Sequence, residues 1–187
     1  MNKALFFAGY LAILGMFVTA VAYVGYNYTK PIIDENTRIK IQENIALLFD
    51  PAEGYKPNEN QESNKYRQDS GEYSAIADIY EVLDANDQLY ALVYDMQVQG
   101  RNDVIHALVA VDPYQSTILG VVYYDHSETP NIGEKYTRPV EIEKLIGQNV
   151  SDVEVDFIAG ATTTWTALEN MYDKLYDHYS KEVHING

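Results

Sequence analysis

The stretch LYALVYDMQVQGRNDVIHALVAV, residues 89–111, decides the fold. Apolar residues alternate along it with the two-residue period of β-strands, and the turn-forming residues GRND at 100–103 interrupt the pattern. The same period continues on both sides, across the turns DAND at 84–87 and DPYQ at 112–115. The pattern therefore predicts a four-stranded antiparallel meander.

Helical periodicity lies on both sides of this meander. A helical face begins near Pro31 and a weaker one spans residues 140–146, while a polar stretch at 51–72 favours a surface loop. A short strand is expected at 153–157, followed by a last helix whose apolar face covers residues 165–179. An antiparallel sheet with helices packed on it defines an α+β fold.

The N-terminal part has the composition of a membrane span. Residues 4–29 carry no charge and are mostly apolar, and a helix needs roughly 20 such residues to cross a bilayer. A cleaved signal peptide with the small-residue site AVA at 20–22 is the alternative, but the apolar run continues past that site. We expect an uncleaved anchor at 1–30, a juxtamembrane helix and polar loop at 31–72, and one domain at 73–187.

Charge and cysteine content exclude several classes of function. The 187 residues include 13 Lys and Arg against 28 Asp and Glu, a net charge of −15. Such acidity argues against nucleic acid as a partner, because a phosphate backbone needs a basic surface. The absence of Cys excludes disulfides and thiolate metal ligands, and four scattered His residues do not predict a metal site.

Two polar segments carry the chemical signals. The sequence HSETPNIG at 126–133 leaves the last strand of the meander, and it is either a surface loop or a binding loop. The sequence DFIAGATTT at 156–164 places small residues and three hydroxyls at a predicted helix start. This second segment is either a Thr N-cap or an anion site, since free N–H groups at a helix start favour a phosphate and Gly160 lets the backbone approach it.

The order of these features resembles the covalent FMN-binding domain family. One span, a meander ending in His-x-Glu-Thr-Pro, and Asp-x-x-x-Gly-Ala-Thr opening a helix occur together. In length the chain suits the G subunit of Rnf-type ion-translocating electron-transport complexes better than its longer relative, the C subunit of sodium-translocating NADH:quinone reductase. The resemblance implies that a flavin transferase attaches FMN to Thr162 through a phosphoester.

The resemblance also implies which residues surround the flavin. Glu128 and Thr129 are expected near the phosphate-to-ribityl part or the ring edge of the flavin and Ile132 against the ring, while His126 either shapes the pocket or is structural. Ala159 stands where the family has Ser or Thr, and Asn131 replaces a usual Gly but tolerates a positive φ. The expected cofactor-binding residues are Thr162, Gly160, Ala161, Thr163, Asp156, His126, Glu128, Thr129 and Ile132.

The function implied is that of a redox-carrier subunit rather than a stand-alone enzyme, with no catalytic side chain because the flavin carries the electrons. Its partners would be membrane lipid and the other membrane subunits of an ion-translocating complex, with the domain on the extracytoplasmic side. Two alternatives remain: an acidic, membrane-anchored assembly module without a cofactor, and the flavin domain of sodium-translocating NADH:quinone reductase or another extracytoplasmic reductase.

Overall fold

The computed structural model describes residues 3–58, 66 and 74–183 and contains two compact units, Met1–Ile41 and Gln42–Gly187. Helix α1 spans Lys3–Leu48, so the helix expected to begin at Pro31 is continuous with the N-terminal one. Proline costs a helix one backbone hydrogen bond without necessarily ending it. Within the described chain, one helical stretch, Phe7–Leu48, is long and apolar enough to cross a membrane.

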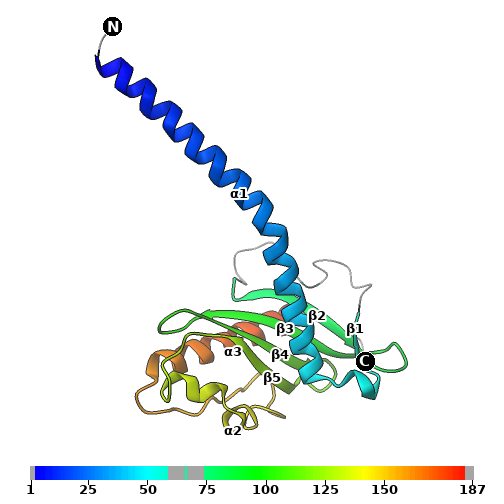
Figure 1. Cartoon of the computed structure of the whole chain (residues 1–187). Coiled ribbons are helices and arrows are strands. Elements are labelled where there is room, and N and C mark those ends of the chain that lie inside the picture. The colour runs from blue at the N-terminus through cyan, green and yellow to red at the C-terminus, as the bar shows by residue number, and fades with distance from the viewer. Residues whose placement is uncertain (1–2, 59–65, 67–73, 184–187) are drawn as a thin grey trace. The chain divides into compact units, whose positions relative to one another are not determined.

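The second unit is built on one antiparallel sheet in the order β1-β2-β3-β4-β5 (Figure 1). The predicted four-stranded meander is confirmed, and a two-residue edge strand is added from the stretch expected to be a loop. The strands are β1 (Lys56–Pro57), β2 (Ile76–Leu83), β3 (Leu89–Gln99), β4 (Val104–Asp112) and β5 (Thr117–Asp125).

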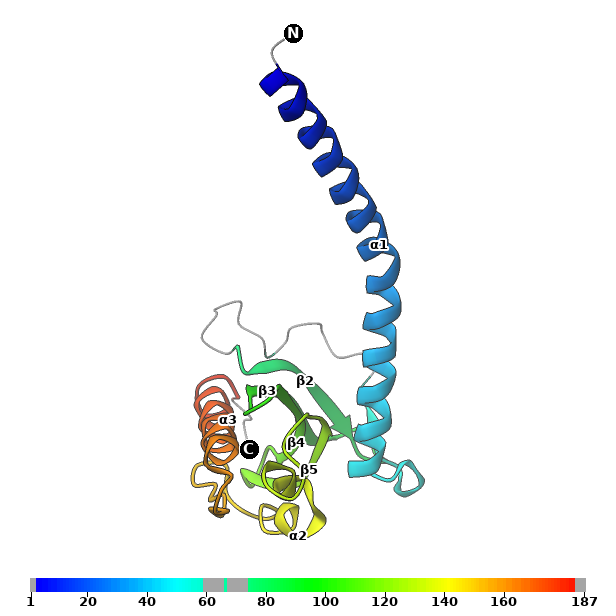
Figure 2. The ribbon, with the colours of Figure 1, turned by 60° about the vertical axis from the view of Figure 1, so that its left-hand side comes forward.

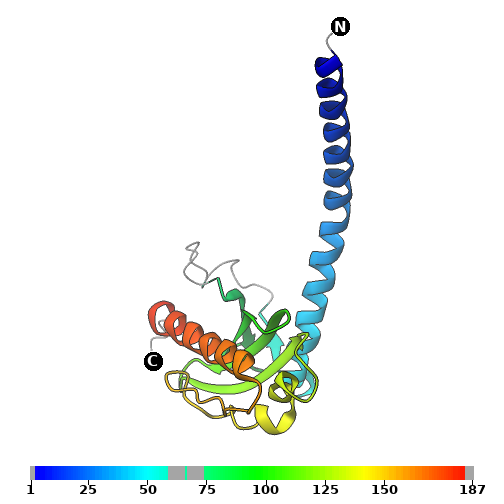
Figure 3. The ribbon, with the colours of Figure 1, turned by 90° about the vertical axis from the view of Figure 1, so that its left-hand side faces the viewer.

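Helix α3 (Thr162–Glu182) covers one face of the sheet (Figure 3). Its buried residues recur every three or four positions, as the apolar face of an amphipathic helix does. They pack with the side chains of one strand parity, including Leu92, Tyr94 and Met96 of β3, all without exposed surface. This is the main core of the unit, and it holds α3 in place along its length.

The opposite face of the sheet is packed against the end of α1 that belongs to this unit (Figure 2). Ile45 and Phe49 are buried, and Leu48 lies so close to Gly120 of β5 that a Cβ there would sit 2.7 Å from Leu48 Cδ2. The buried apolar side chains of the other strand parity form this second layer. They are Val82, Ala91, Val93, Leu108 and Ala110.

The chain between β5 and α3 contains the short helices η3 (Gly133–Thr137) and α2 (Pro139–Ile142). The helix expected at 140–146 is therefore confined to its first turn. The strand expected at 153–157 is wrong: within the described chain these residues belong to no strand. Side chains satisfy its backbone instead, since Gln148 Oε1 accepts from Glu154 N at 2.7 Å and Trp165 Nε1 donates to Val155 O at 2.8 Å.

Candidate functional site

Three consecutive threonines begin α3 in two different environments. Thr162 and Thr163 are exposed, whereas Thr164 is 2% exposed. Of the two alternatives for this segment, the Thr N-cap is wrong: Ala161 is the N-cap, and no side chain of the described residues caps the helix. The first intrahelical bond runs from Trp165 N to Ala161 O at 2.9 Å, so the N–H groups of 162–164 precede the helical ladder. The helix start is thus suited to an external anion.

The turn before α3 depends on Gly160, as expected. Its φ of 88° lies in the left-handed region, which favours glycine, while a Cβ at this position would meet no atom within 4 Å. Backbone conformation rather than crowding therefore selects glycine here. Ala161 is buried and donates its N–H to Ile158 O at 3.0 Å, which closes the turn, and Ala159 is exposed.

Glu128 joins three segments beneath the start of α3. Its side chain is 6% exposed, and Oε2 accepts a 2.5 Å hydrogen bond from Thr164 Oγ1. Its other oxygen, Oε1, accepts from Arg101 N in the β3–β4 turn at 2.8 Å. The carboxylate therefore ties the 126–133 loop to both the turn and the helix, and both of its oxygens are engaged inside the protein.

Two glycines make room for the Glu128 carboxylate. A Cβ at Gly100 would overlap Glu128 Oε1, and a Cβ at Gly133 would overlap Glu128 Oε2 and lie 2.6 Å from Thr164 Oγ1. Both glycines have ordinary negative φ values, so the requirement is for space. Gly100 and Arg101 were missed by the sequence reasoning, because their connection to Glu128 is visible only in three dimensions.

The 126–133 loop is ordered by a set of local hydrogen bonds. Asn131 has a φ of 59°, which confirms that it takes the positive φ expected in place of glycine. Its N–H donates to Glu134 Oε2 at 3.0 Å, and its Oδ1 accepts from Arg138 Nη2 at 2.7 Å. Thr129 Oγ1 accepts a long 3.4 Å bond from Asn102 Nδ2, and Ile132 packs on the edge of the core.

The remaining predicted residues differ in how far the protein already engages them. His126 is half-buried, and its Nδ1 is the one buried side-chain nitrogen or oxygen of the described residues that lacks a hydrogen-bond partner. Asp156 is exposed and paired at 2.8 Å with Lys144, which also binds Glu141 at 2.7 Å. A buried unsatisfied polar atom is costly, so His126 is the better candidate for binding an external group.

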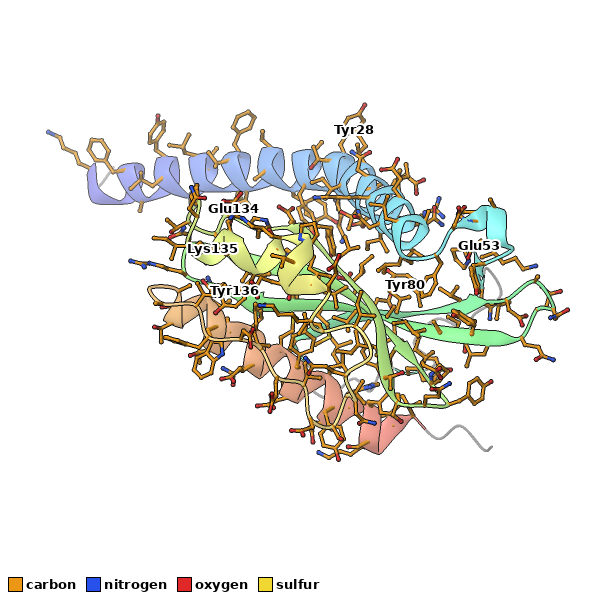
Figure 4. All side chains as sticks on the ribbon, turned by 90° about the horizontal axis from the view of Figure 1, so that it is seen from below. Tyr28, Glu53, Tyr80, Glu134, Lys135 and Tyr136 are labelled. Atoms are coloured by element: carbon orange, nitrogen blue, oxygen red, sulfur yellow. The ribbon has the colours of Figure 1, made fainter. Side chains whose placement is uncertain are left out.

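Tyr136 of η3 is a further positioning residue that the sequence did not reveal. Its side chain is 3% exposed, and it lies on the side of η3 that is closest to α3 (Figure 4). Its Oη accepts from Ile158 N at 3.0 Å and so anchors the turn that leads to Thr162. Burial raises the pKa of the Tyr136 phenol, and the hydrogen bond from Ile158 N partly opposes that shift.

Comparison with known proteins gives first the class of domain that part of the chain matches. Residues 100–177 match the family of the FMN-binding domain, and this stretch includes the 126–133 loop, the turn at Gly160 and all three threonines. The match begins at the β3–β4 turn, where Arg101 contacts Glu128. Every residue considered above as a cofactor contact therefore lies inside the matched region.

Curated relatives of the chain include C subunits of the Na(+)-translocating NADH-quinone reductase. The chain is similar to the C subunit of the Na(+)-translocating NADH-quinone reductase of Yersinia pestis, with 26% identity over 52% of this chain and 44% of that protein. The corresponding protein of Haemophilus ducreyi is 27% identical over 68% of this chain and 55% of its own length. The matched part of this chain thus spans about half the length of these curated relatives.

A solved structure has the same fold. The crystal structure of Shewanella oneidensis NqrC superposes with a TM-score of 0.54 at 19% identity, covering 78% of this chain and 99% of that one. The expected α+β architecture, an N-terminal apolar helix followed by an antiparallel sheet with packed helices, is confirmed by this likeness.

The residues at the start of α3 fit a phosphate ester of the kind that FMN contains. Thr162 presents an exposed hydroxyl at the first helical position, and the neighbouring N–H groups and the helix dipole favour a phosphate's negative charge. No acidic residue lies in the first turn to oppose that charge. A flavin phosphate would therefore find a hydroxyl for attachment and donors for its oxygens in one place.

Proposed function

We propose that this chain is an electron-carrying subunit of a membrane redox complex, with FMN linked covalently to Thr162 by a phosphoester. The observation that carries the proposal is the exposed Thr162 hydroxyl on an uncapped helix start within a match to the FMN-binding domain family. Attachment keeps a redox cofactor from diffusing away while it changes charge. The chain would require a flavin transferase for this modification.

In this proposal the protein binds and orients while the flavin supplies the redox chemistry. Thr162 holds the phosphate end, and the N–H groups of Thr163 and its neighbours, beside Gly160 and Ala161, offset the phosphate charge. His126, Thr129 and Ile132 border the ribityl chain and ring from the 126–133 loop. Glu128 holds the start of α3 through its hydrogen bond from Thr164, and Asp156 lies exposed in the segment that precedes this start.

The cellular setting is the second part of the proposal. We place the chain in an Rnf-type ion-translocating complex, anchored by its N-terminal helix with the flavin domain on the extracytoplasmic side and with the other membrane subunits as partners. Membership of a sodium-translocating NADH:quinone reductase is the second candidate, because the curated relatives bear that name. Purification of the native complex and identification of its subunits decides between them.

The flavin itself is tested on the intact full-length chain co-produced with a flavin transferase. We expect a fluorescent band after denaturing electrophoresis and an intact mass raised by one FMN less one water, as ester formation requires. Omission of the transferase is the control and leaves the band dark. A dark band with an active transferase, shown on a known flavinylated substrate, would instead favour the assembly module without a cofactor.

A further inference from the structure

An aromatic pair lies beside the proposed attachment point. The rings of Phe157 and Trp165 meet edge to face, with centroids 5.4 Å apart and planes at 88°. Phe157 belongs to the extended segment before the Gly160 turn, and Trp165 lies in the first turn of α3. The pair therefore brackets Thr162 from both directions along the chain.

Helix geometry places Trp165 and Thr162 on one side of α3. Residues three apart on a helix are surface neighbours, with about 5–6 Å between their Cβ atoms. Thr164, two positions from Thr162, faces the interior and bonds to Glu128, as expected for a residue rotated by about 200° at 3.6 residues per turn. Thr162 and Trp165 are thus neighbours at the start of α3, with Thr162 exposed and Trp165 partly buried, while Thr164 faces the interior.

The pair is held in place but only partly covered. Trp165 Nε1 donates to Val155 O at 2.8 Å, which fixes the indole, and its ring packs at the edge of the main core. Phe157 contacts this fixed ring and is nonetheless 58% exposed. A single exposed Phe needs no explanation, but this one is held by a fixed indole that lies one helical turn from the proposed attachment point, and it offers an exposed aromatic ring there.

We propose that the isoalloxazine ring of FMN packs against the surface formed by Phe157 and Trp165. The inference rests on the proposed attachment at Thr162, which fixes only the phosphate end of the cofactor. The flexible ribityl chain allows the isoalloxazine ring to reach a nearby aromatic surface. Contact between aromatic rings, stacked or edge to face, contributes binding free energy beyond that of the area they bury. This surface is supplied by the chain's own 153–165 region, in addition to the 126–133 loop.

Contact with Trp165 has an optical consequence. Indole in van der Waals contact donates an electron to photoexcited flavin and quenches its emission, whereas a phenylalanine ring does not. Trp165 is the only tryptophan of the chain, so its substitution removes every indole from the protein. Replacement by Phe keeps an aromatic wall and removes the quencher.

The experiment measures flavin emission of the full-length flavinylated chain at matched occupancy, established by intact mass. We expect Trp165→Phe to raise the emission several-fold, with the loss of its fastest decay component. Phe157→Leu should shift the flavin absorption bands and near-ultraviolet dichroism, because it removes part of the wall. Tyr176→Phe is the matched control: this exposed aromatic lies on the same helix, about 16 Å further along it, and its change should leave the flavin signals unaltered.

Unchanged flavin emission in Trp165→Phe together with unchanged spectra in Phe157→Leu would overturn the inference and place the ring elsewhere. If Trp165→Phe prevents flavinylation, the exposed Phe157→Leu variant carries the test, since its side chain contributes little to the core. Absence of covalent flavin from the unsubstituted chain is a separate outcome, because it contradicts the attachment itself and not the position of the ring.

Discussion

At the residue scale, position rather than residue type decides what each of the three threonines can do. Thr162→Val should abolish the covalent flavin, since valine keeps the shape but has no hydroxyl to esterify. Thr163→Val should retain it. The measurement is in-gel flavin fluorescence with intact mass, and a fluorescent Thr162→Val chain would move the attachment to Thr163, the other exposed hydroxyl.

Thr164→Val should retain the flavin but weaken the fold. Thr164 is buried, and its hydroxyl is committed to Glu128, so it is not available to a transferase. Its loss leaves Glu128 Oε2 buried without that donor, which costs about 1–3 kcal/mol. Thermal unfolding of the variant against Thr163→Val measures the difference, and equal stabilities of the two would show that the buried bond contributes nothing.

A third prediction at this scale concerns a carboxylate outside the set of residues proposed to contact the flavin. Asp95 of β3 is 4% exposed, and burial raises its pKa to about 6. A 2.7 Å hydrogen bond from Tyr124 Oη and the proximity of His106 oppose that shift. Asp78, directly opposite on β2, adds to it. The folded pKa lies above the unfolded value near 3.9, so the fold binds the proton more tightly. This contribution stabilises the fold below about pH 4 and is lost as the pH rises through about 6.

Asp95→Asn should therefore stabilise the fold at neutral pH by up to about 3 kcal/mol, because the amide is neutral and still accepts from Tyr124. The gain should vanish near pH 4. Unfolding midpoints of both chains between pH 4 and 8 provide the measurement, with Asp173→Asn on the exposed side of α3 as the control. A parallel pH profile for Asp95→Asn and the unsubstituted chain would contradict the prediction.

Residue-scale predictions from sequence succeeded where backbone preference alone decides. Asn131 takes the positive φ that was expected of it in place of glycine, whereas Gly160 is required by its own positive φ and not by the close backbone approach expected from the sequence. Predictions from sequence failed where tertiary contacts distinguish residues of the same type. The sequence TTT does not reveal that Thr164 bonds to Glu128 or that Ala161 occupies the cap position. The expected flavin contacts of the 126–133 loop remain predictions.

At the element scale, Glu128 connects a turn, a loop and a helix, and its substitution should loosen all three. Glu128→Ala leaves Arg101 N and the Thr164 hydroxyl without their acceptor in a site that Gly100 and Gly133 keep tightly enclosed. We expect a loss of about 1–3 kcal/mol for each buried polar group left unsatisfied. Hydrogen exchange should rise at the start of α3 more than at its end.

Glu128→Gln is the matched variant. Its amide oxygen still accepts from Arg101 N, and its amide nitrogen donates to the Thr164 hydroxyl, so both contacts survive with their geometry little changed. The stability should fall much less than in Glu128→Ala. Equal losses in the two variants would mean that negative charge, rather than the hydrogen bonds, holds the helix start.

Helices and strands could be predicted from the sequence where apolar residues recur at a regular spacing. The apolar residues of 76–124 predict β2 to β5, and because the sheet is covered on both faces, the middle of β3 and of β4 is an unbroken run of buried residues rather than a strict alternation. The two-residue strand β1 carries no such pattern and exists only through its pairing with β2. Residues 153–157 show alternation without a strand, because side chains of Gln148 and Trp165 satisfy backbone groups that a ladder would otherwise pair.

At the scale of the whole molecule, the N-terminal helix is long and apolar enough to cross a membrane, and the extracytoplasmic position proposed for the domain at 31–187 can be tested. Leu11, Phe17 and Val24 are each more than half exposed on α1, as the lipid-facing side chains of a span are. We expect protease added to sealed, right-side-out cells to digest the domain at 31–187. Protection of the domain in those cells, with digestion only after lysis, would place it on the cytoplasmic side.

The face of the sheet opposite α3 determines how far the chain can be truncated from its N-terminus without uncovering buried side chains. The apolar layer that includes Val93 and Leu108 is packed against the end of α1, where Ile45 is 2% and Phe49 8% exposed. Burial of one such side chain is worth about 1.5–3 kcal/mol. Removal of residues 1–30 leaves this cover in place, whereas removal of residues 1–50 uncovers a continuous apolar sheet face.

A chain beginning at residue 31 should therefore be soluble, monomeric and cooperatively folded. One beginning at residue 51 should associate or unfold at a markedly lower temperature, although it keeps every residue from 100 to 177 that matches the FMN-binding domain. Size-exclusion chromatography and thermal unfolding of the two chains make the comparison, with Ile45→Ala in the longer chain as an intermediate. If the shorter chain were equally soluble and stable, residues 42–49 would contribute nothing to the fold, and the domain would begin at the sheet itself.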